Sequence, residues 1–216
     1  LSLYCRLWGV PVKRIRKGRG VKRELTRRHH KQLHQLCSSR DRYFDVFRRS
    51  GFDFGEAFTS LFSTPVDQQQ FADITPPKKD GETWIAIAPF AKHAGKIYPT
   101  EKMAEVVATL AARPATKIFL FGGGGDEQLK LREWARQHDN VISMAEKRHG
   151  FPKELALLSC VDAMVSMDSA NMHLASLVQV PVVSVWGATH PFCGFTGWKQ
   201  SPDNAVQLDL DCRPCS

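Results

Sequence analysis

Three features are scarce in the sequence: long apolar runs, paired cysteines and, in the first 50 residues, acidic side chains. No apolar stretch approaches the roughly 18 residues of a membrane-spanning helix, so no such helix is predicted. The six Cys are scattered apart from Cys212 and Cys215, a usage typical of free thiols in a reducing compartment. The chain begins LSLYCRLWGV, without Met or a clear secretory signal, and we expect further residues upstream of Leu1.

The shortage of acidic residues is confined to the first segment. Residues 1–50 contain 3 Asp/Glu against 15 Lys/Arg, whereas the remaining residues contain 19 against 15, so the first segment accounts for the net charge of +8. A basic excess favours an anionic partner. Because His29, His30 and Tyr43 are interleaved with the basic residues, a nucleic-acid-binding module is one hypothesis, although no recognised motif accompanies them. A solvated helix face is the simpler interpretation.

From Trp84 onward, short apolar runs alternate with amphipathic segments. The expected strands are TWIAIAPF, TKIFLF, NVIS, DAMVSMD and VPVVSVWG, with AVQLDL as a candidate sixth. The expected helices are TEKMAEVVATLAARP, with Thr100 as its cap, DEQLKLREWARQH, PKELALLSCV and SANMHLASLVQ. Nearly continuous apolar strands indicate a parallel sheet covered on both faces. We therefore predict the α/β class with a doubly wound parallel sheet.

The residues before this region follow a different pattern. Residues 21–36 and 41–52 predict basic helices, and the Pro76-Pro77 pair ends an irregular linker. We therefore divide the chain into a basic helical segment with its linker at residues 1–75 and an α/β domain at residues 76–216.

Polar loops are expected along one edge of the sheet, because ligands of open parallel sheets bind outside the carboxyl ends of the strands. Four loops fall there: PFAKHAGKIYP, GGGGDE, MDSANMH and WGATHP. Helix N-termini offer N–H groups to an anion, and Lys92 and Lys96 add positive charge. Asp126, Glu127 and Asp168 can accept hydrogen bonds from hydroxyls. This set suits a phosphate joined to a polyol, as in a sugar nucleotide.

Each feature alone also has a simpler interpretation. The Gly run at 122–125 lacks the spacing of the dinucleotide fingerprint and suits a tight turn. Asp168 and Ser169 suit a helix cap, and His173 suits a structural histidine. Lys96 suits a solvated side chain. The CRPC stretch has the spacing of half a zinc site, but no second pair is present. Only the combination of the loops favours a binding site.

Three stretches carry a family resemblance: MDSANMHLAS…PVVSVWGATHP, GKIYPTEKMAEVV and FGGGGDEQ. The first resembles Asp-Ser/Thr-Gly-x-x-His followed by a helix and a strand ending in Gly-x-Thr-x-Pro, a pattern of glycosyltransferase family 9, the lipopolysaccharide ADP-heptose heptosyltransferase family. The second resembles the family's Lys-x-Trp-Pro element, and the third resembles its Gly-rich loop followed by acidic residues. The CRPC end is similar to a Cys-rich tail of many members. Ala170 stands where the family usually has Gly, so we expect this loop to differ in detail.

The resemblance implies the C-terminal, Rossmann-like donor domain of a GT-B fold, preceded by part of the N-terminal acceptor domain. It implies that backbone N–H groups at Ser169 and Ala170 bind the diphosphate and that Asp168 holds heptose hydroxyls. His173 would support this loop. The other implied donor-binding residues are Lys96 near the diphosphate and sugar, Glu127 or Asp126 at the ribose, and Phe151 in the segment 149–151 beside the base. Lys92 joins the predicted donor site because of its charge and its place in the loop.

The resemblance also implies an activity. It is the inverting, metal-independent transfer of heptose from ADP-heptose to a lipopolysaccharide core or lipid A-linked acceptor in cell-envelope synthesis, without a cofactor. The expected location is cytoplasmic, peripheral at the inner membrane, with no nucleic acid partner. The family's general base would lie upstream of Leu1, so no catalytic residue is assigned and this chain is expected to retain donor binding only. The alternatives are the nucleic-acid-binding module and a GT-B enzyme with another nucleotide-sugar donor.

Overall fold

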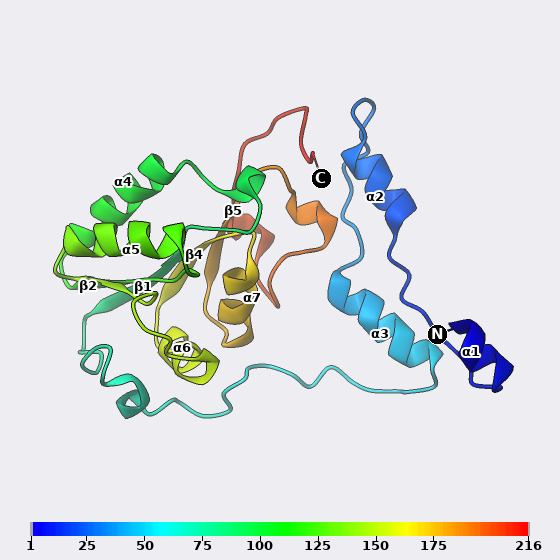
Figure 1. The fold of residues 1–216 in the computed structure, drawn as a ribbon, viewed down its shortest axis with the longest axis horizontal. Helices are drawn as coiled ribbons and strands as arrows, with labels where there is room; N and C mark the ends of the chain where they lie inside the picture. The colour runs from blue at the N-terminus through cyan, green and yellow to red at the C-terminus, as the bar shows by residue number, and fades with distance from the viewer. Residues whose placement is uncertain (1, 216) are drawn as a thin grey trace.

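The body of the protein is a six-stranded, all-parallel sheet in the computed structural model, which describes residues 2–215 (Figure 1). The strand order is β3-β2-β1-β4-β5-β6. The strands are β1 Thr83–Ala88, β2 Thr116–Leu120, β3 Val141–Ser143, β4 Ala163–Met167, β5 Val182–Trp186 and β6 Ala205–Gln207. Two series of strands run outward from β1 and from β4, which is the doubly wound order of a Rossmann-like domain. The α/β prediction, with AVQ of the candidate sixth strand as β6, is confirmed.

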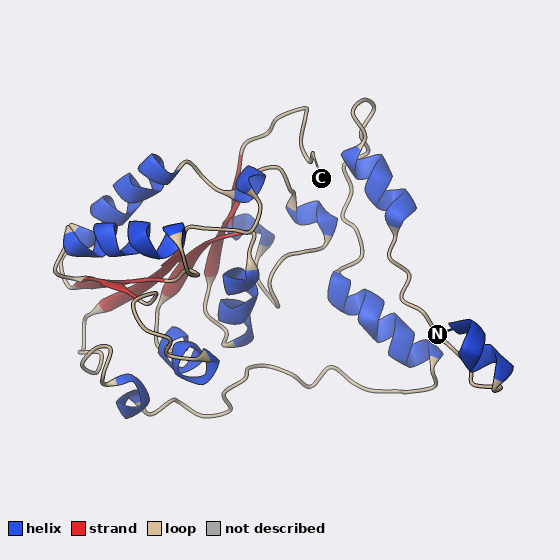
Figure 2. Cartoon of the chain, viewed as in Figure 1, coloured by secondary structure: helices blue, strands red, loops and turns tan. Residues whose placement is uncertain are grey.

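Helices cover both faces of this sheet, as the apolar strands predicted (Figures 1 and 2). The four helices are α4 Thr100–Ala111, α5 Asp126–Arg136, α6 Phe151–Leu158 and α7 Ala170–Leu177. On one face, Met103 of α4 and Leu131 of α5 pack with Ile85 and Ile87 of β1. On the other face, α6 and α7 pack against side chains of alternate residues of the same strands.

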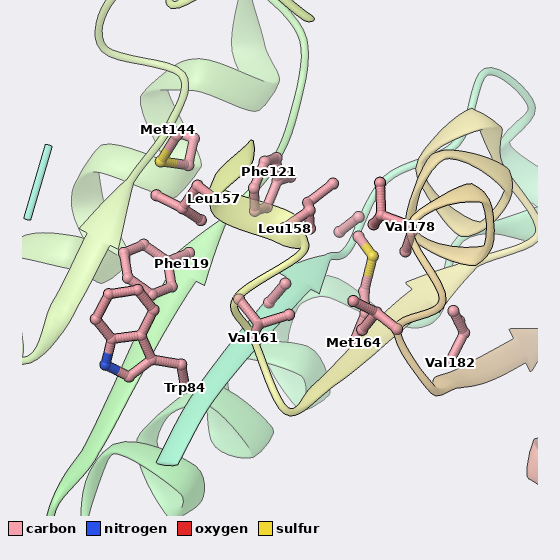
Figure 3. Close-up of a cluster of buried hydrophobic side chains, with 14 of the residues drawn as sticks. Trp84, Phe119, Phe121, Met144, Leu157, Leu158, Val161, Met164, Val178 and Val182 are labelled. Carbon is pink, nitrogen blue, oxygen red and sulfur yellow. The ribbon is translucent and has the colours of Figure 1, made fainter. Parts of the chain in front are cut away.

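The alternation is clearest along β1. Trp84, Ala86 and Ala88 belong to the cluster beneath α6 and α7, and Ile85 and Ile87 belong to the opposite one. Trp84 is fully buried, and its ring centroid lies 5.0 Å from that of Phe119 (Figure 3). Both faces of the central strand are therefore apolar because both are covered, which is the pattern of a buried parallel strand.

One helix start differs from the sequence prediction. Thr100 is the first residue of α4, and Pro99 occupies the cap position, with no side-chain hydrogen bond to the helix. The prediction that Thr100 caps α4 is therefore wrong. Proline fits at this end because the first turn of a helix leaves its N–H groups without intrahelical partners.

Before β1, residues 2–82 form only helices and loops (Figure 2). The main helices there are α1 Ser2–Leu7, α2 Arg19–Thr26 and α3 Ser39–Arg49. A single helix over residues 21–36 was predicted, and this is wrong because α2 ends at Thr26. His30 has a positive φ of 53°, and the chain then runs extended, so that the Leu36 N–H donates to the Phe192 carbonyl at 2.8 Å. A contact far away in sequence ends this helix.

A small apolar seam joins this first segment to the body. Leu25 of α2 and Leu36 form a buried cluster with Cys193 of the 3₁₀-helix η3, Pro191–Cys193. The irregular linker then passes under the sheet domain (Figure 1). Its short helix η1, Gln68–Phe71, places the fully buried Phe71 against Trp84. No helix within residues 2–215 is long and apolar enough to cross a membrane.

Candidate functional site

The two series of strands diverge between β1 and β4, and the loops that follow these two strands meet there. The loop after β1 contains the 3₁₀-helix η2, Ala94–Lys96, and the loop after β4 is Asp168 and Ser169, directly before α7. In doubly wound sheets a ligand crevice forms at this switch point. Lys96 Nζ lies 2.6 Å from Asp168 Oδ2, so the structure joins two of the predicted site residues directly.

Asp168 is held by two donors in a buried position. Its side chain is only 5% exposed, and Oδ2 accepts a hydrogen bond from Thr189 Oγ1 at 2.7 Å in addition to the Lys96 contact. Neither contact uses Oδ1. Ser169 occupies the cap position of α7, as the helix-cap interpretation predicts. Its side chain makes no hydrogen bond to the helix, so the expected capping bond is absent. A buried carboxylate needs such partners to remain charged.

A close approach of two loops brings Thr189 to Asp168. The Ala188 N–H, after β5, donates to the Gly95 carbonyl at 2.7 Å. A Cβ on Gly187 would collide with that same carbonyl, so glycine is required for this contact. The loops after β1, β4 and β5 are therefore packed into one wall.

The first residues of α7 lie at this crevice. Ala170 is the first residue of α7, in a helical conformation that alanine favours. The expected departure at this position, Ala for Gly, therefore needs no unusual backbone angle. The first N–H groups of a helix lack intrahelical partners and carry the positive end of the helix dipole, so they favour an anion.

A cavity of about 510 Å³ opens at these groups. Seven of the nine predicted donor-site residues line it: Lys92, Lys96, Glu127, Asp168, Ser169, Ala170 and His173. Asp126 and Phe151, the first residues of α5 and α6, do not line it, and the Phe151 side chain is 65% exposed. Roles for these two residues stay predictions.

Glu127 links the Gly-rich loop to the cavity. Its Oε2 accepts a hydrogen bond from the Gly123 N–H at 2.8 Å. Of the two acidic residues proposed for the ribose, only Glu127 lines the cavity, so the geometry favours Glu127 over Asp126.

His173 lies between this cavity and a second one. Burial lowers the pKa of its imidazole; the Asp168 charge raises that pKa and the Lys96 charge lowers it further. The ring is therefore mostly neutral at pH 7, with one nitrogen able to donate and the other able to accept. The second cavity, of about 520 Å³, also contains His173 and Phe195 in its lining, together with Ser38–Asp41 and residues 196–200.

Several lining residues were not identified from the sequence. Phe195 carries no local signal of a site, whereas Phe90 and Asn171 lie in the predicted loops PFAKHAGKIYP and MDSANMH without being singled out there. Thr189 was part of the Gly-x-Thr-x-Pro element, yet its bond to Asp168 becomes visible only when β4 and β5 are adjacent. Such pairs cannot be identified from local sequence, because adjacent strands of a parallel sheet are separated by a long crossover connection.

Metal ligands do not gather in the described structure. Within residues 2–215, no three His, Cys, Asp or Glu side chains lie close enough to hold an ion. Asp209 and Asp211 have the Asp-x-Asp spacing, but both are exposed in the segment after β6 and do not line the cavity.

Several known proteins are similar to this chain in sequence. The family model described as "Glycosyltransferase family 9 (heptosyltransferase)" matches residues 13–216. Lipopolysaccharide heptosyltransferase 3 of Escherichia coli is 29% identical over 131 residues, which cover 59% of this chain and 37% of the relative. Lipopolysaccharide heptosyltransferase 1 of Pseudomonas aeruginosa is 26% identical over 155 residues, covering 69% and 40%. The chain thus spans about two fifths of these relatives.

Solved structures share the fold at lower identity. A glycosyltransferase family 9 structure from Veillonella parvula superposes with a TM-score of 0.63 at 19% identity, covering 82% of this chain and 51% of that one. The E. coli heptosyltransferase WaaC with ADP gives a TM-score of 0.56 at 20% identity, covering 83% and 52%. These likenesses support the GT-B architecture, of which the sheet domain is the Rossmann-like half. On the family match over residues 13–216, the chain belongs to glycosyltransferase family 9, the heptosyltransferase family.

Proposed function

We propose that the protein is a heptosyltransferase of lipopolysaccharide synthesis and that the cavity between β1 and β4 binds its nucleotide diphospho-sugar. The observation that carries the proposal is the Lys96–Asp168 pair at the start of α7. Lys96 and the first N–H groups of α7 would bind the diphosphate, and Asp168 Oδ1 would accept from a sugar hydroxyl. ADP-heptose is the proposed donor, since the curated relatives are named heptosyltransferases and WaaC was determined with ADP.

The proposed reaction is a single displacement. The acceptor hydroxyl oxygen attacks the anomeric carbon, the bond from that carbon to the diphosphate oxygen breaks, ADP leaves and the configuration inverts. Lys96 and the α7 N–H groups neutralise the charge that develops on the leaving diphosphate, which is the role of preorganised donors. This supports transfer without a metal ion. The acceptor proton passes to a general base as the new bond forms.

The second cavity is the proposed place of the acceptor. It adjoins the donor cavity at His173 and Phe195, and Arg40 and Lys199 lie at its wall, both over the Trp198 ring. A phosphorylated core saccharide would find cations there. Transfer to that acceptor also needs a positioned base, which is worth about 10²–10⁴ in rate.

The first segment supports a proposed location at the cytoplasmic face of the inner membrane. Leu7 and Trp8 are 77% and 72% exposed, and residues 13–19 that follow include five Lys or Arg. Exposed apolar side chains beside basic ones suit anionic lipid. Sedimentation with vesicles containing phosphatidylglycerol, and not with phosphatidylcholine alone, is expected; equal binding to random RNA would instead favour the nucleic-acid alternative.

Calorimetric titration with ADP, UDP and GDP tests the proposed donor. We expect selective binding of ADP, about tenfold or more weaker in Asp168→Ala, since hydrogen bonds to charged groups are worth about 1.5–3 kcal/mol. Asp139→Ala is the matched control, because Asp139 is exposed and lies outside the cavity. Tighter UDP or GDP binding would indicate a different donor, and binding insensitive to Asp168→Ala would contradict this site.

A further inference from the structure

Arg213, inside the CRPC stretch, is a buried cation surrounded by carbonyl oxygens. It is only 7% exposed. Its Nε donates to the Gly187 carbonyl at 2.5 Å, and Nη2 donates to the Thr189 carbonyl at 2.7 Å. Nη1 donates to the Leu208 carbonyl, and Nη2 also reaches Gln207 Oε1 at 3.1 Å. Burying a guanidinium costs free energy unless its donors are satisfied, so this set of acceptors fixes its position.

The carbonyls that accept from Arg213 belong to the loop after β5, which is part of the wall of the proposed donor cavity. Gly187 and Thr189 flank Ala188, whose own carbonyl accepts from the Cys215 N–H at 2.7 Å. Three consecutive carbonyls after β5 therefore accept hydrogen bonds from the C-terminal tail, residues 212–215. The tail is in turn anchored from the first segment, because Lys31 Nζ donates to the carbonyls of Cys212 and Pro214, both at 2.6 Å.

This arrangement forms a chain of contacts that ends at the cavity. Arg213 holds the Thr189 backbone, the Thr189 hydroxyl donates to Asp168, and Asp168 pairs with Lys96. We propose that Arg213 is a positioning residue of the donor site, which acts through Thr189 to fix the Asp168 carboxylate. The inference rests on the proposed donor function of that cavity. It assigns to the CRPC stretch a role that needs no metal and no disulfide.

The test replaces the guanidinium by an ammonium. Arg213→Lys keeps the charge but cannot supply the forked donors to Gly187 and Thr189. We expect about tenfold weaker ADP binding and faster amide hydrogen exchange in residues 187–190 of the unliganded chain. Arg113→Lys is the matched control, because Arg113 is exposed at the end of α4, and it should change neither.

Variants of Thr189 distinguish positioning from general support of the fold. Thr189→Val should weaken ADP binding about as much as Arg213→Lys, and Thr189→Ser should restore it, because only the hydroxyl contacts Asp168. If Arg213 acts through Thr189, the double variant Arg213→Lys/Thr189→Val should bind about as weakly as either single one. Thr189→Val keeps the bonds of Arg213 to the backbone, so it measures the Thr189–Asp168 contact separately from the Arg213 contacts.

Unchanged exchange at residues 187–190 in Arg213→Lys would overturn the inference, as would strictly multiplicative losses of affinity in the double variant. Absence of ADP binding by the unsubstituted chain would contradict the proposed function instead. The exchange measurement would then decide on its own whether Arg213 fixes the loop.

Discussion

The sheet domain and the first segment bury their apolar side chains to very different extents. In the domain, Trp84 and Phe119 are fully buried between sheet and helices. In the first segment, Leu7 and Trp8 are largely exposed, and α3 has no buried residue. The domain therefore has a core of its own, whereas the first segment is held to it through a small seam. The core therefore forms where strands and helices alternate regularly and cover each other's apolar faces.

The two regions also contribute different residues to the two cavities. The domain supplies the Lys96–Asp168 pair, the α7 N-terminus and Glu127, all at the carboxyl edge of its strands. The first segment supplies basic charge and one wall of the second cavity, through Ser38–Asp41. Donor binding should thus depend on the domain, and acceptor or surface binding on the segment.

A pair of tryptophan truncations tests this contrast with the largest expected effect. Trp84→Ala should lower the free energy of unfolding by about 3–5 kcal/mol, because it empties a fully buried site. Trp8→Ala should change it by less than about 0.5 kcal/mol, because the ring is 72% exposed. Urea titrations followed by circular dichroism measure both. Comparable losses in the two variants would mean that Trp8 is buried in solution, for instance in an oligomer.

A leucine truncation tests how firmly the seam holds. Leu25→Ala should cost about 2–3 kcal/mol, since Leu25 is fully buried against Leu36 and Cys193. The matched Val21→Ala, at an exposed position of the same helix, should change the free energy of unfolding by less than about 0.5 kcal/mol, because alanine has the higher helix propensity and little packing is lost. If Leu25→Ala left the main unfolding transition unchanged, the first segment would not fold cooperatively with the domain.

The smallest expected effect is a pH dependence that arises in the domain. Burial lowers the pKa values of His173 and His190 below the ordinary 6.5. The unfolded chain therefore binds more protons than the folded one just below pH 6.5. The contribution of the two neutral histidines to the free energy of unfolding is fully present above that pH and is lost as the pH falls through it. His173→Gln should flatten the decline of the thermal midpoint between pH 7 and 5.5. The exposed His29→Gln should leave the slope as it is, and an equal slope in all three proteins would refute the assignment.

Local patterns predicted most elements of the domain, because its four helices and all its strands except β3 and β6 are long enough to show their own period. They failed at two helix ends. The helix predicted over residues 21–36 stops at Thr26 because the chain must extend for Leu36 to bond with Phe192. Thr100 looked like a cap, yet Pro99 takes that position.

The candidate site was predictable in its residue types and not in its contacts. The four polar loops were located because parallel strands align their carboxyl ends. The partners of Asp168 come from the loops after β1 and β5, at distances in sequence that no local pattern reports. Arg213 was hidden for the same reason, because the meaning of the CRPC stretch depends on the loop that its arginine reaches.

Whether the start of α7 binds a diphosphate is tested by comparing the affinity of this chain for ADP with its affinity for adenosine. We expect ADP to bind at least about a hundredfold more tightly, and Lys96→Met to remove most of the difference, because the phosphates contribute the charge-assisted bonds. Equal affinities for the two ligands, or an ADP preference unaffected by Lys96→Met, would contradict it.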